Sequence, residues 1–136
     1  MQDGTPPPPG HPRETDAARG DAYARDCPTR QLLDRVGDKW SVLVLQLLGA
    51  APRRFSALKR EIGGISQKML SQTLRSLERD GLVTRHVEPS VPVKVSYAIT
   101  PLGGELVGAL ALMIDWAERR MTTVLAAQRR YDTSAG

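Results

Sequence analysis

The stretch Ser66-Gln-Lys-Met-Leu-Ser-Gln-Thr-Leu-Arg-Ser-Leu-Glu-Arg-Asp80 has the pattern of an amphipathic helix. A turn at Gly63-Gly64 precedes it, Ser66 is a favourable N-cap residue, and Asp80-Gly81 is a common helix end. At about 100° per residue, the apolar and the basic side chains fall on opposite sides of this helix. The apolar side carries Ser66, Leu70, Thr73, Leu74 and Leu77. The opposite side carries Lys68, Gln72, Arg75 and Arg79, with Ser71 beside them and no acidic residue.

The basic side of this helix suits a nucleic acid. Solvent-exposed helix faces usually mix both signs of charge, and this one does not. Lys and Arg side chains pair with phosphates and guanine, and Gln and Ser side chains can bond to base edges. The alternative is a surface helix that is basic by chance. The helix taken alone does not separate these two interpretations.

The neighbouring segments predict a winged helix-turn-helix fold. Residues 55–62 have a short amphipathic pattern, so a helix, a glycine turn and the basic helix follow in order. Residues 82–87 are rich in β-prone side chains, and residues 93–99 alternate with a period of two. Pro89 and Pro92 mark the loop between these strands, because proline cannot donate to a strand ladder. The expected fold class is mainly α with a small β-hairpin, whose loop forms the wing.

Three more helices are expected around this motif. Cys27-Pro28 is a typical helix start, and Gly37-Asp38 should end that helix. The length of residues 39–48 fits either a buried strand or a buried helix, and the ten-residue span with its stop at Gly49 favours a helix. Because this segment is apolar almost all round, the helix should be central. Pro52-Arg53-Arg54 is expected to be a connector. Thr100-Pro101 should begin a long last helix that reaches residue 124 or beyond.

The last helix is more apolar than one neighbour requires, which favours a second copy of the chain as its partner. Winged helices commonly bind two half-sites, and this supports a C-terminal dimerisation helix. The alternative is a long helix that only covers its own domain. The residues expected at the dimer interface are Leu32, Val36, Leu106, Leu110, Met113, Trp116, Ala117 and Met121.

Length and composition set the outer limits. The 136 residues suit one domain with tails: a Pro-rich disordered tail over 1–26, the domain over 27–124, and a frayed tail over 125–136. The formal charge of +4 and the isoelectric point of about 9.6 suit an anionic partner. We find no membrane-spanning stretch and no secretory signal in residues 1–26, so a cytoplasmic location is expected.

Few residues suggest chemistry. One cysteine, with His11 and His86 far apart, does not predict a metal site, and no cofactor motif or acid–base pair indicates an enzyme. Cys27 lies at an expected helix start near Arg25 and Arg30, which favours its thiolate form, whereas Asp26 opposes it. With no second cysteine, sensing would need an intersubunit disulfide or an adduct. From the residues alone, an inert packing role for Cys27 is favoured.

The chain resembles the HxlR family of bacterial winged-helix transcription regulators, relatives of the MarR type. The resemblance covers about residues 27–121, and it departs at Asp38, where the family usually has glycine, and in the wing. It rests on these segments in this order: Cys27-Pro28, Val36-Gly37-Asp38-Lys39-Trp40-Ser41, Arg54-Phe55-Ser56-Ala57-Leu58, Gly64-Ile65-Ser66-Gln67-Lys68-Met69-Leu70, Leu77-Glu78-Arg79-Asp80-Gly81-Leu82-Val83 with Arg85, and Tyr97 with Ile99-Thr100-Pro101-Leu102-Gly103.

The resemblance implies a homodimeric DNA-binding repressor or activator with dimer contacts from its first and last helices. It also implies that Cys27 stands where several members carry a redox or electrophile sensor, so that an oxidant or a small molecule would be the effector. The expected partner is double-stranded DNA with a pseudo-palindromic operator. A winged-helix protein-interaction module without DNA is the alternative, and a thiol enzyme built on Cys27 lacks a resolving cysteine. The residues expected to contact DNA are Ser66, Gln67, Lys68, Ser71, Gln72, Arg75 and Arg79 on the helix, and Arg85 and Lys94 on the hairpin, with His86 beside them.

Overall fold

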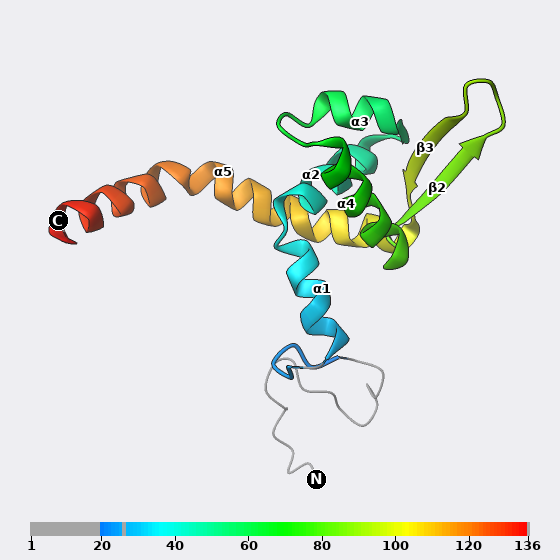
Figure 1. Cartoon of the computed structure of the whole chain (residues 1–136). Coiled ribbons are helices and arrows are strands. Elements are labelled where there is room, and N and C mark those ends of the chain that lie inside the picture. Colours follow the sequence, from blue (N-terminus) through cyan, green and yellow to red (C-terminus); the bar gives the residue numbers. More distant parts are fainter. Residues whose placement is uncertain (1–19, 26, 136) are drawn as a thin grey trace, which may run out of the picture. The chain divides into compact units, whose positions relative to one another are not determined.

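The computed structural model describes residues 20–25 and 27–135. These residues form helices and a small antiparallel sheet (Figure 1). They fall into two compact units that divide within one helix, between Val42 and Leu43. The predicted fold class is confirmed. In chain order the elements are α1 (Pro28–Val36), α2 (Lys39–Ala50), β1 (Arg53–Arg54), α3 (Phe55–Glu61), α4 (Gln67–Arg79), β2 (Val83–Glu88), β3 (Lys94–Ile99) and α5 (Pro101–Ala135).

Helix α4 has the ends and the buried side that its sequence predicts. The Ser66 hydroxyl oxygen accepts a hydrogen bond from the Met69 backbone N–H at 3.1 Å and caps the helix. Gly81 follows the last turn with a φ of 77°, a conformation that favours glycine. Leu70, Leu74 and Leu77 are buried together with Thr73. The opposite side of α4 therefore remains free for solvent or a partner.

The core of the second unit draws on nearly every element of that unit. Its buried apolar side chains are Val44, Leu45, Leu48, Leu58, Ile62, Ile65, Leu70, Leu74, Leu77, Leu82, Val83, Tyr97 and Leu110. Leu110 corrects a prediction, because its side chain is only 2% exposed and belongs to the core of its own chain. Helical periodicity placed it on the apolar stripe of α5, but the stripe changes from core to surface along the helix.

The sheet has three strands in the order β1-β3-β2, all antiparallel. Arg53 and Arg85 both lie opposite Tyr97, and one residue along, Arg54 and His86 both lie opposite Ser96. The expectation that 52–54 is only a connector was wrong. A two-residue strand has no hydrophobic period of its own, and only its pairing with β3 defines it.

A junction at Thr100 joins three elements. Its backbone N–H donates to the Leu82 carbonyl at 3.0 Å, and its hydroxyl donates to the Gly81 carbonyl at 2.7 Å. The same hydroxyl oxygen accepts the Gly103 N–H at 3.0 Å, which caps α5. Gly103 is buried, and a Cβ there would overlap the Leu82 carbonyl oxygen. The end of α4, the end of β3 and the start of α5 are thus held together.

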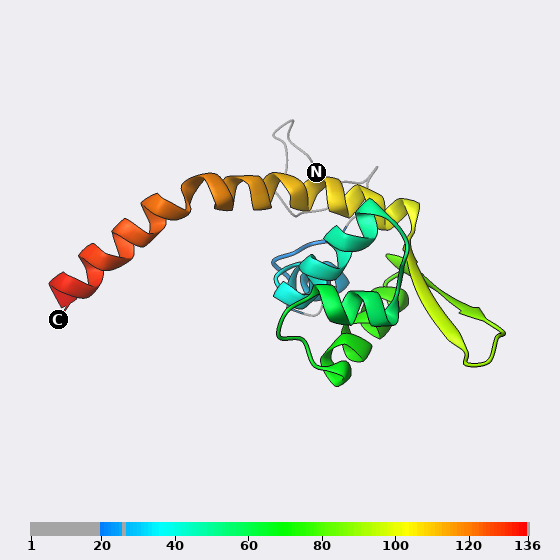
Figure 2. The same cartoon turned by 90° about the horizontal axis from the view of Figure 1, so that it is seen from above.

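Helix α2 is slightly longer than predicted, and α5 continues through a segment that was expected to fray. Gly49 does not end α2, which continues to Ala50. A Cβ on Gly49 would lie 2.9 Å from Val107 Cγ1, so glycine permits close contact between α2 and α5. Helix α5 runs to Ala135, so residues 125–135, expected to fray, are helical (Figure 2). Among the described helices, none combines the length and apolar character that a membrane crossing requires.

The described part of the first unit consists of a turn, α1 and the start of α2. The expected disordered tail lies outside the described residues at 1–19 and 26, but residues 20–25 form a turn. In that turn the Tyr23 N–H donates to Asp21 Oδ1 at 3.0 Å, and the Ala24 N–H donates to the Asp21 carbonyl at 3.2 Å. Helix α2 begins where Asp38 Oδ2 accepts both the backbone N–H and the hydroxyl of Ser41.

Candidate nucleic-acid interface

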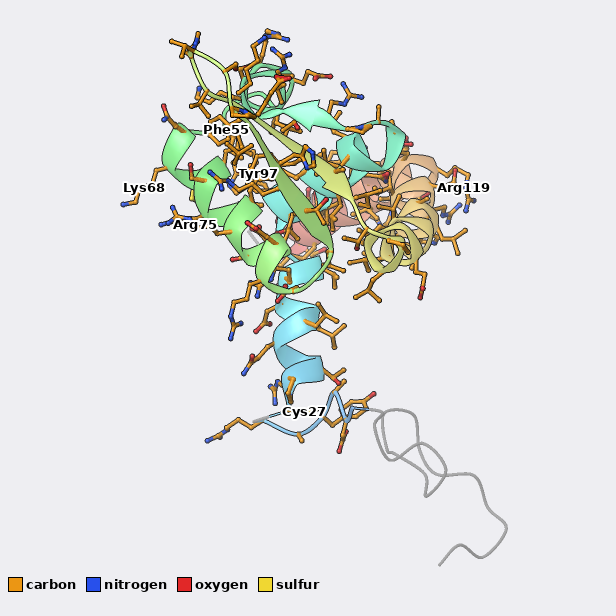
Figure 3. The ribbon with its side chains drawn as sticks, turned by 90° about the vertical axis from the view of Figure 1, so that its right-hand side faces the viewer. Cys27, Phe55, Lys68, Arg75, Tyr97 and Arg119 are labelled. Carbon is orange, nitrogen blue, oxygen red and sulfur yellow. The ribbon has the colours of Figure 1, made fainter. Side chains whose placement is uncertain are left out.

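The polar side of α4 is a continuous exposed surface. Lys68, Gln72, Arg75 and Arg79 are all exposed, and α4 carries no acid in its first turn. Figure 3 shows Lys68 and Arg75 extending from the same side of α4, away from Arg119 on α5. Arg75 Nε makes only a long bond of 3.4 Å to the Ser71 carbonyl. These side chains are free to reorganise toward an anionic partner, and we call this surface the α4 face.

The first turn of α4 contributes differently from residue to residue. Gln67 is exposed and Ser71 is half-buried. Ser66 uses one acceptor site of its oxygen to cap the helix, so its hydroxyl proton is still available to a partner. This turn therefore offers an amide and two hydroxyl groups next to Lys68.

A groove of about 450 Å³ lies between the start of α4 and the hairpin. We call it the wing groove. Figure 3 shows two of its lining residues, Phe55 and Tyr97, between α4 and the strands. It brings the predicted residues Gln67, Ser71, Arg85 and Lys94 into one place. Its lining residues are Arg54, Phe55, Ser56, Gln67, Ser71, Arg85, Val93, Lys94, Val95 and Tyr97.

The other predicted hairpin residue, His86, lies elsewhere. It lines a second groove of about 390 Å³ along the wing, together with Glu88, Pro89 and Ser96. Arg54 and Lys94 line both grooves. Arg54 and Ser56 were not predicted from the sequence as site residues. The sequence offered one indication, which is that Arg54 directly precedes the predicted helix-turn-helix and Ser56 lies within it. The strand that orients Arg54 could not be predicted from the sequence.

Cys27 lies at the start of α1, as predicted, and is half-buried. The hydrogen bond with the Thr29 side chain is the largest influence that lowers the pKa of the Cys27 thiol, followed by the Thr29 backbone. The Asp21 backbone N–H donates to Sγ at 3.1 Å and acts in the same direction. Arg30 contributes through its backbone rather than its charge, and desolvation opposes the shift. Asp26, expected to oppose the thiolate, lies outside the described residues.

The residues predicted for a dimer interface are exposed to different degrees. On α5, Met113 is 59% and Trp116 is 56% exposed, with Met121 at 42%, and the neighbouring Leu112 reaches 75%. Ala117 is exposed and Leu106 is half-buried. On α1, Leu32 is exposed, Val36 is half-buried, and none of the nine residues is buried. Apart from Leu110, each predicted residue retains accessible surface.

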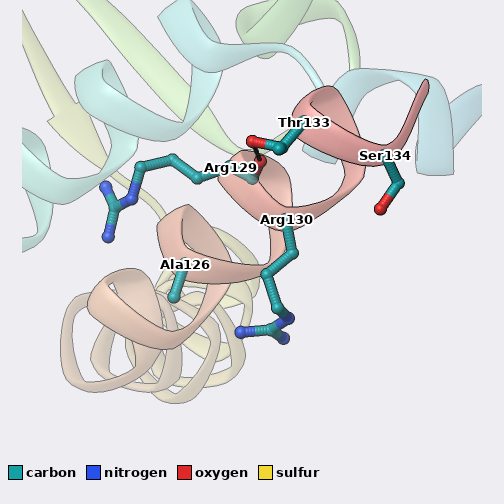
Figure 4. Close-up of a pocket in the computed structure, with 5 residues that line it drawn as sticks. All are labelled: Ala126, Arg129, Arg130, Thr133 and Ser134. Carbon is teal, nitrogen blue, oxygen red and sulfur yellow. Dashed lines mark hydrogen bonds between the residues drawn. The ribbon is translucent and has the colours of Figure 1, made fainter. Parts of the chain in front are cut away.

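The far end of α5 carries a shallow depression that lacks the features of a site. Its lining comes from one helix alone: Ala126, Arg129, Arg130, Thr133 and Ser134 (Figure 4). The Thr133 hydroxyl donates to the Arg129 carbonyl at 2.9 Å, a bond within that helix. Across the described ranges, no three His, Cys, Asp or Glu side chains gather as metal ligands would.

The sequence and structure match known proteins over most of the chain. YtfH of Escherichia coli, an uncharacterised HTH-type transcriptional regulator, is 44% identical over 107 residues, or 79% of this chain and 85% of that protein. The solved structure of ytfH from Salmonella typhimurium has a TM-score of 0.78 and 41% identity, covering 82% of this chain and 99% of that one.

A second solved structure, the redox regulator HypR in its reduced form, has a TM-score of 0.68 and 33% identity. The match covers 73% of this chain and 98% of the HypR chain. A family model described as HxlR-like helix-turn-helix matches residues 35–124, which include α2, the helix-turn-helix, the hairpin and much of α5. The chain therefore belongs to the HxlR-like helix-turn-helix family of transcriptional regulators.

Proposed function

We propose that this regulator binds double-stranded DNA in a sequence-specific manner as a homodimer. The observation that carries the proposal is the α4 face, which presents Lys68, Gln72 and Arg75 to solvent while the opposite side of the helix is buried. A helix with this distribution can enter the major groove without exposing the core.

The side chains divide by the contacts they can make. Arg75 and Lys68 suit guanine or phosphate, and the Gln67 and Gln72 amides suit adenine, because these pairs match the donors and acceptors of the base edges. Arg79, in the last turn, is expected to contact a phosphate or to make no contact with DNA. Arg85 and Lys94 on the hairpin are expected to contact the backbone beside α4.

The competing proposal is a winged-helix module that binds a protein and not DNA. A protein partner would have to be strongly acidic to match the α4 face, whereas every DNA sequence supplies that charge. A role in transcription on chromosomal DNA would also place the regulator in the cytoplasm.

A homodimer is supported by the exposed apolar side chains of α5 and, separately, of α1. Large exposed apolar patches commonly mark an interaction surface. A two-fold dimer presents two α4 helices, so the operator is expected to be pseudo-palindromic.

Regulation through Cys27 is a further part of the proposal. Support comes from the hydrogen bonds that lower the pKa of its thiol, since the thiolate is the reactive form. The likeness to HypR, a protein described as a redox regulator, supports it as well. An oxidant or an electrophilic small molecule is the effector this implies.

The test of DNA recognition begins with genomic fragments recovered on the wild-type protein. Lys68, Gln72 and Arg75 are then replaced together by alanine, and affinity for a recovered site is measured by fluorescence anisotropy. Each base-reading side chain lost should cost about 1–3 kcal/mol of specific binding. Arg130→Ala, which removes a cation at the far end of α5, should bind normally. Unchanged affinity in a folded triple variant would contradict the proposal.

A further inference from the structure

We infer that the wing groove holds a backbone phosphate of the bound DNA, and that Arg54 on β1 is a principal cation of that site. The inference rests on the proposed function and adds to it a phosphate-binding cation on β1, outside α4 and the hairpin. It also commits the groove to DNA rather than to a small-molecule effector.

The wing groove is lined by positive charge. Arg54, Arg85 and Lys94 come from three different strands and line the same groove, which has no acidic lining residue. Within the part of the chain that the structure describes, none of these three side chains makes an ion pair or a side-chain hydrogen bond. Like charges gathered around one groove repel each other, and a bound anion relieves that repulsion.

The second groove serves as an internal comparison. It shares Arg54 and Lys94 but includes Glu88, so two cations face one carboxylate, against three cations and no carboxylate in the wing groove. An anion is therefore favoured in the wing groove. Arg54 and Lys94 lie at the boundary between the two grooves.

The neighbouring arginine explains why Arg54 is available. Arg53 Nη1 bonds to both carboxylate oxygens of Glu61, at 2.7 and 3.0 Å, so its charge is already compensated. Successive side chains of a strand point to opposite faces, so Arg54 does not share this partner. Pairing of β1 with β3 fixes the backbone of both residues.

By register Arg54 and Lys94 belong to the face of His86 and Ser96, and Arg85 belongs to the face of Tyr97. Arg54 and Lys94 therefore reach the wing groove from its boundary with the second groove.

Size does not distinguish the possible occupants, but the position of the groove does. A volume of about 450 Å³ also falls within the range of small-molecule sites. The groove, however, includes Gln67 and Ser71 from the first turns of α4, beside the face proposed to read bases. Phosphate contacts fix the register of a protein on the duplex. A phosphate in the wing groove would lie next to the bases that the α4 face is proposed to recognise. Phe55, Val95 and Tyr97 supply apolar contact for a flanking deoxyribose.

The experiment measures how salt weakens binding to a mixed-sequence DNA duplex, using the full chain and fluorescence anisotropy. Each phosphate contact contributes about 0.9 to the slope of log K against log salt concentration for B-DNA. Arg54→Ala should lower the magnitude of this slope by about one unit for each wing groove that contacts the duplex. Arg54→Lys retains the charge and should retain the wild-type slope. Arg130→Ala provides the matched control and should keep the wild-type slope. Circular dichroism and thermal melting confirm the fold, and Arg54→Gln replaces Arg54→Ala if alanine destabilises the protein.

The outcomes separate this inference from the proposed function. If the wild-type protein does not bind DNA, the proposed function fails and the inference fails with it. If the wild-type protein binds and the alanine variant of Lys68, Gln72 and Arg75 is impaired, but Arg54→Ala keeps the full slope, only the inference is overturned. Loss of inorganic phosphate binding in Arg54→Ala, with the DNA slope unchanged, would make the groove a small-anion site and also overturn it.

Discussion

Cys27 shows how hydrogen bonds within one turn can alter the chemistry of a single side chain. The arginines nearby, which the sequence brings to mind first, are not the principal cause of its lowered pKa. The Thr29 side chain contributes most, and the Asp21 and Arg30 backbones act in the same direction. Substitution can remove these hydrogen-bonding groups one at a time.

Thr29→Val should raise the pKa of the Cys27 thiol. The native hydrogen bond stabilises the thiolate, so the thiolate persists to lower pH in the wild type than in the variant. The rate of iodoacetamide labelling should therefore rise at a lower pH in the wild type. Thr29→Ser keeps a hydroxyl group and should behave like the wild type. Coincident labelling profiles for Thr29→Val and the wild type would show that Thr29 has no such role.

The same thiol tests the proposed regulation. Diamide should reduce DNA binding by the wild type and leave Cys27→Ser unaffected, as measured by anisotropy on a recovered site. An equal response of both proteins would assign the oxidant effect to another residue. No response in either protein would leave Cys27 with a packing role only.

At the scale of elements, the start of α5 contains two adjacent glycines with opposite expected effects. Gly103→Ala forces a Cβ against the Leu82 carbonyl and the Ile99 side chain, so the backbone must shift. We expect a loss of about 1–3 kcal/mol or more in the free energy of unfolding, typical of overpacking. Gly104 meets nothing within 4 Å, so Gly104→Ala should stabilise by about 0.4–1 kcal/mol. Urea denaturation measures both, and equal effects would disprove the described packing.

The elements that the sequence predicted are those with local signals. Ser66 and Gly81 mark the ends of α4, and alternation marks the hairpin, because caps and periods depend on neighbouring residues. Strand β1 depends on β3, which is distant in sequence, and so Arg54 was missed. Gly49 looked like a helix end, but it allows close packing against Val107. For the same reason, the α4 face could be predicted but the wing groove could not.

Leu110 illustrates a second limit of pattern reasoning. A helical stripe shows which side of a helix is apolar, but it does not say whether the covering surface belongs to the same chain or to another. In α5 the early part of the stripe meets its own core, and Met113 and Trp116 are exposed. Only the position of the neighbouring elements separates the core residues of a helix from its interface residues.

At the scale of the whole molecule, Trp116→Glu should convert the proposed dimer to a monomer. A charge at this exposed aromatic residue would be desolvated in an apolar interface, and burying an unpaired charge is costly. Light scattering at micromolar concentration should show a dimer for the wild type and a monomer for the variant. Tyr131→Glu, at a residue 73% exposed near the end of α5, provides the matched control and should remain dimeric. A monomeric wild type that binds a palindrome tightly would rule out the dimer.

Dimerisation also makes a prediction about the operator. Two α4 helices related by a two-fold axis require half-sites separated by about 10 base pairs or a multiple of that. Footprinting on a recovered site measures the spacing directly.

The junction at Thr100 has a consequence for how such a protein could be controlled. With 35 residues, α5 is a lever about 50 Å long, and its fulcrum is the point where Thr100 binds the end of α4. In the proposed dimer, a slight change in the angle between the two α5 helices would displace both α4 helices along the duplex. A signal need not reach any side chain that touches DNA; it needs only to change an angle. The surface that recognises the operator and the surface that responds to the signal can then diverge separately in evolution. Only the fulcrum at Thr100 is constrained by both functions.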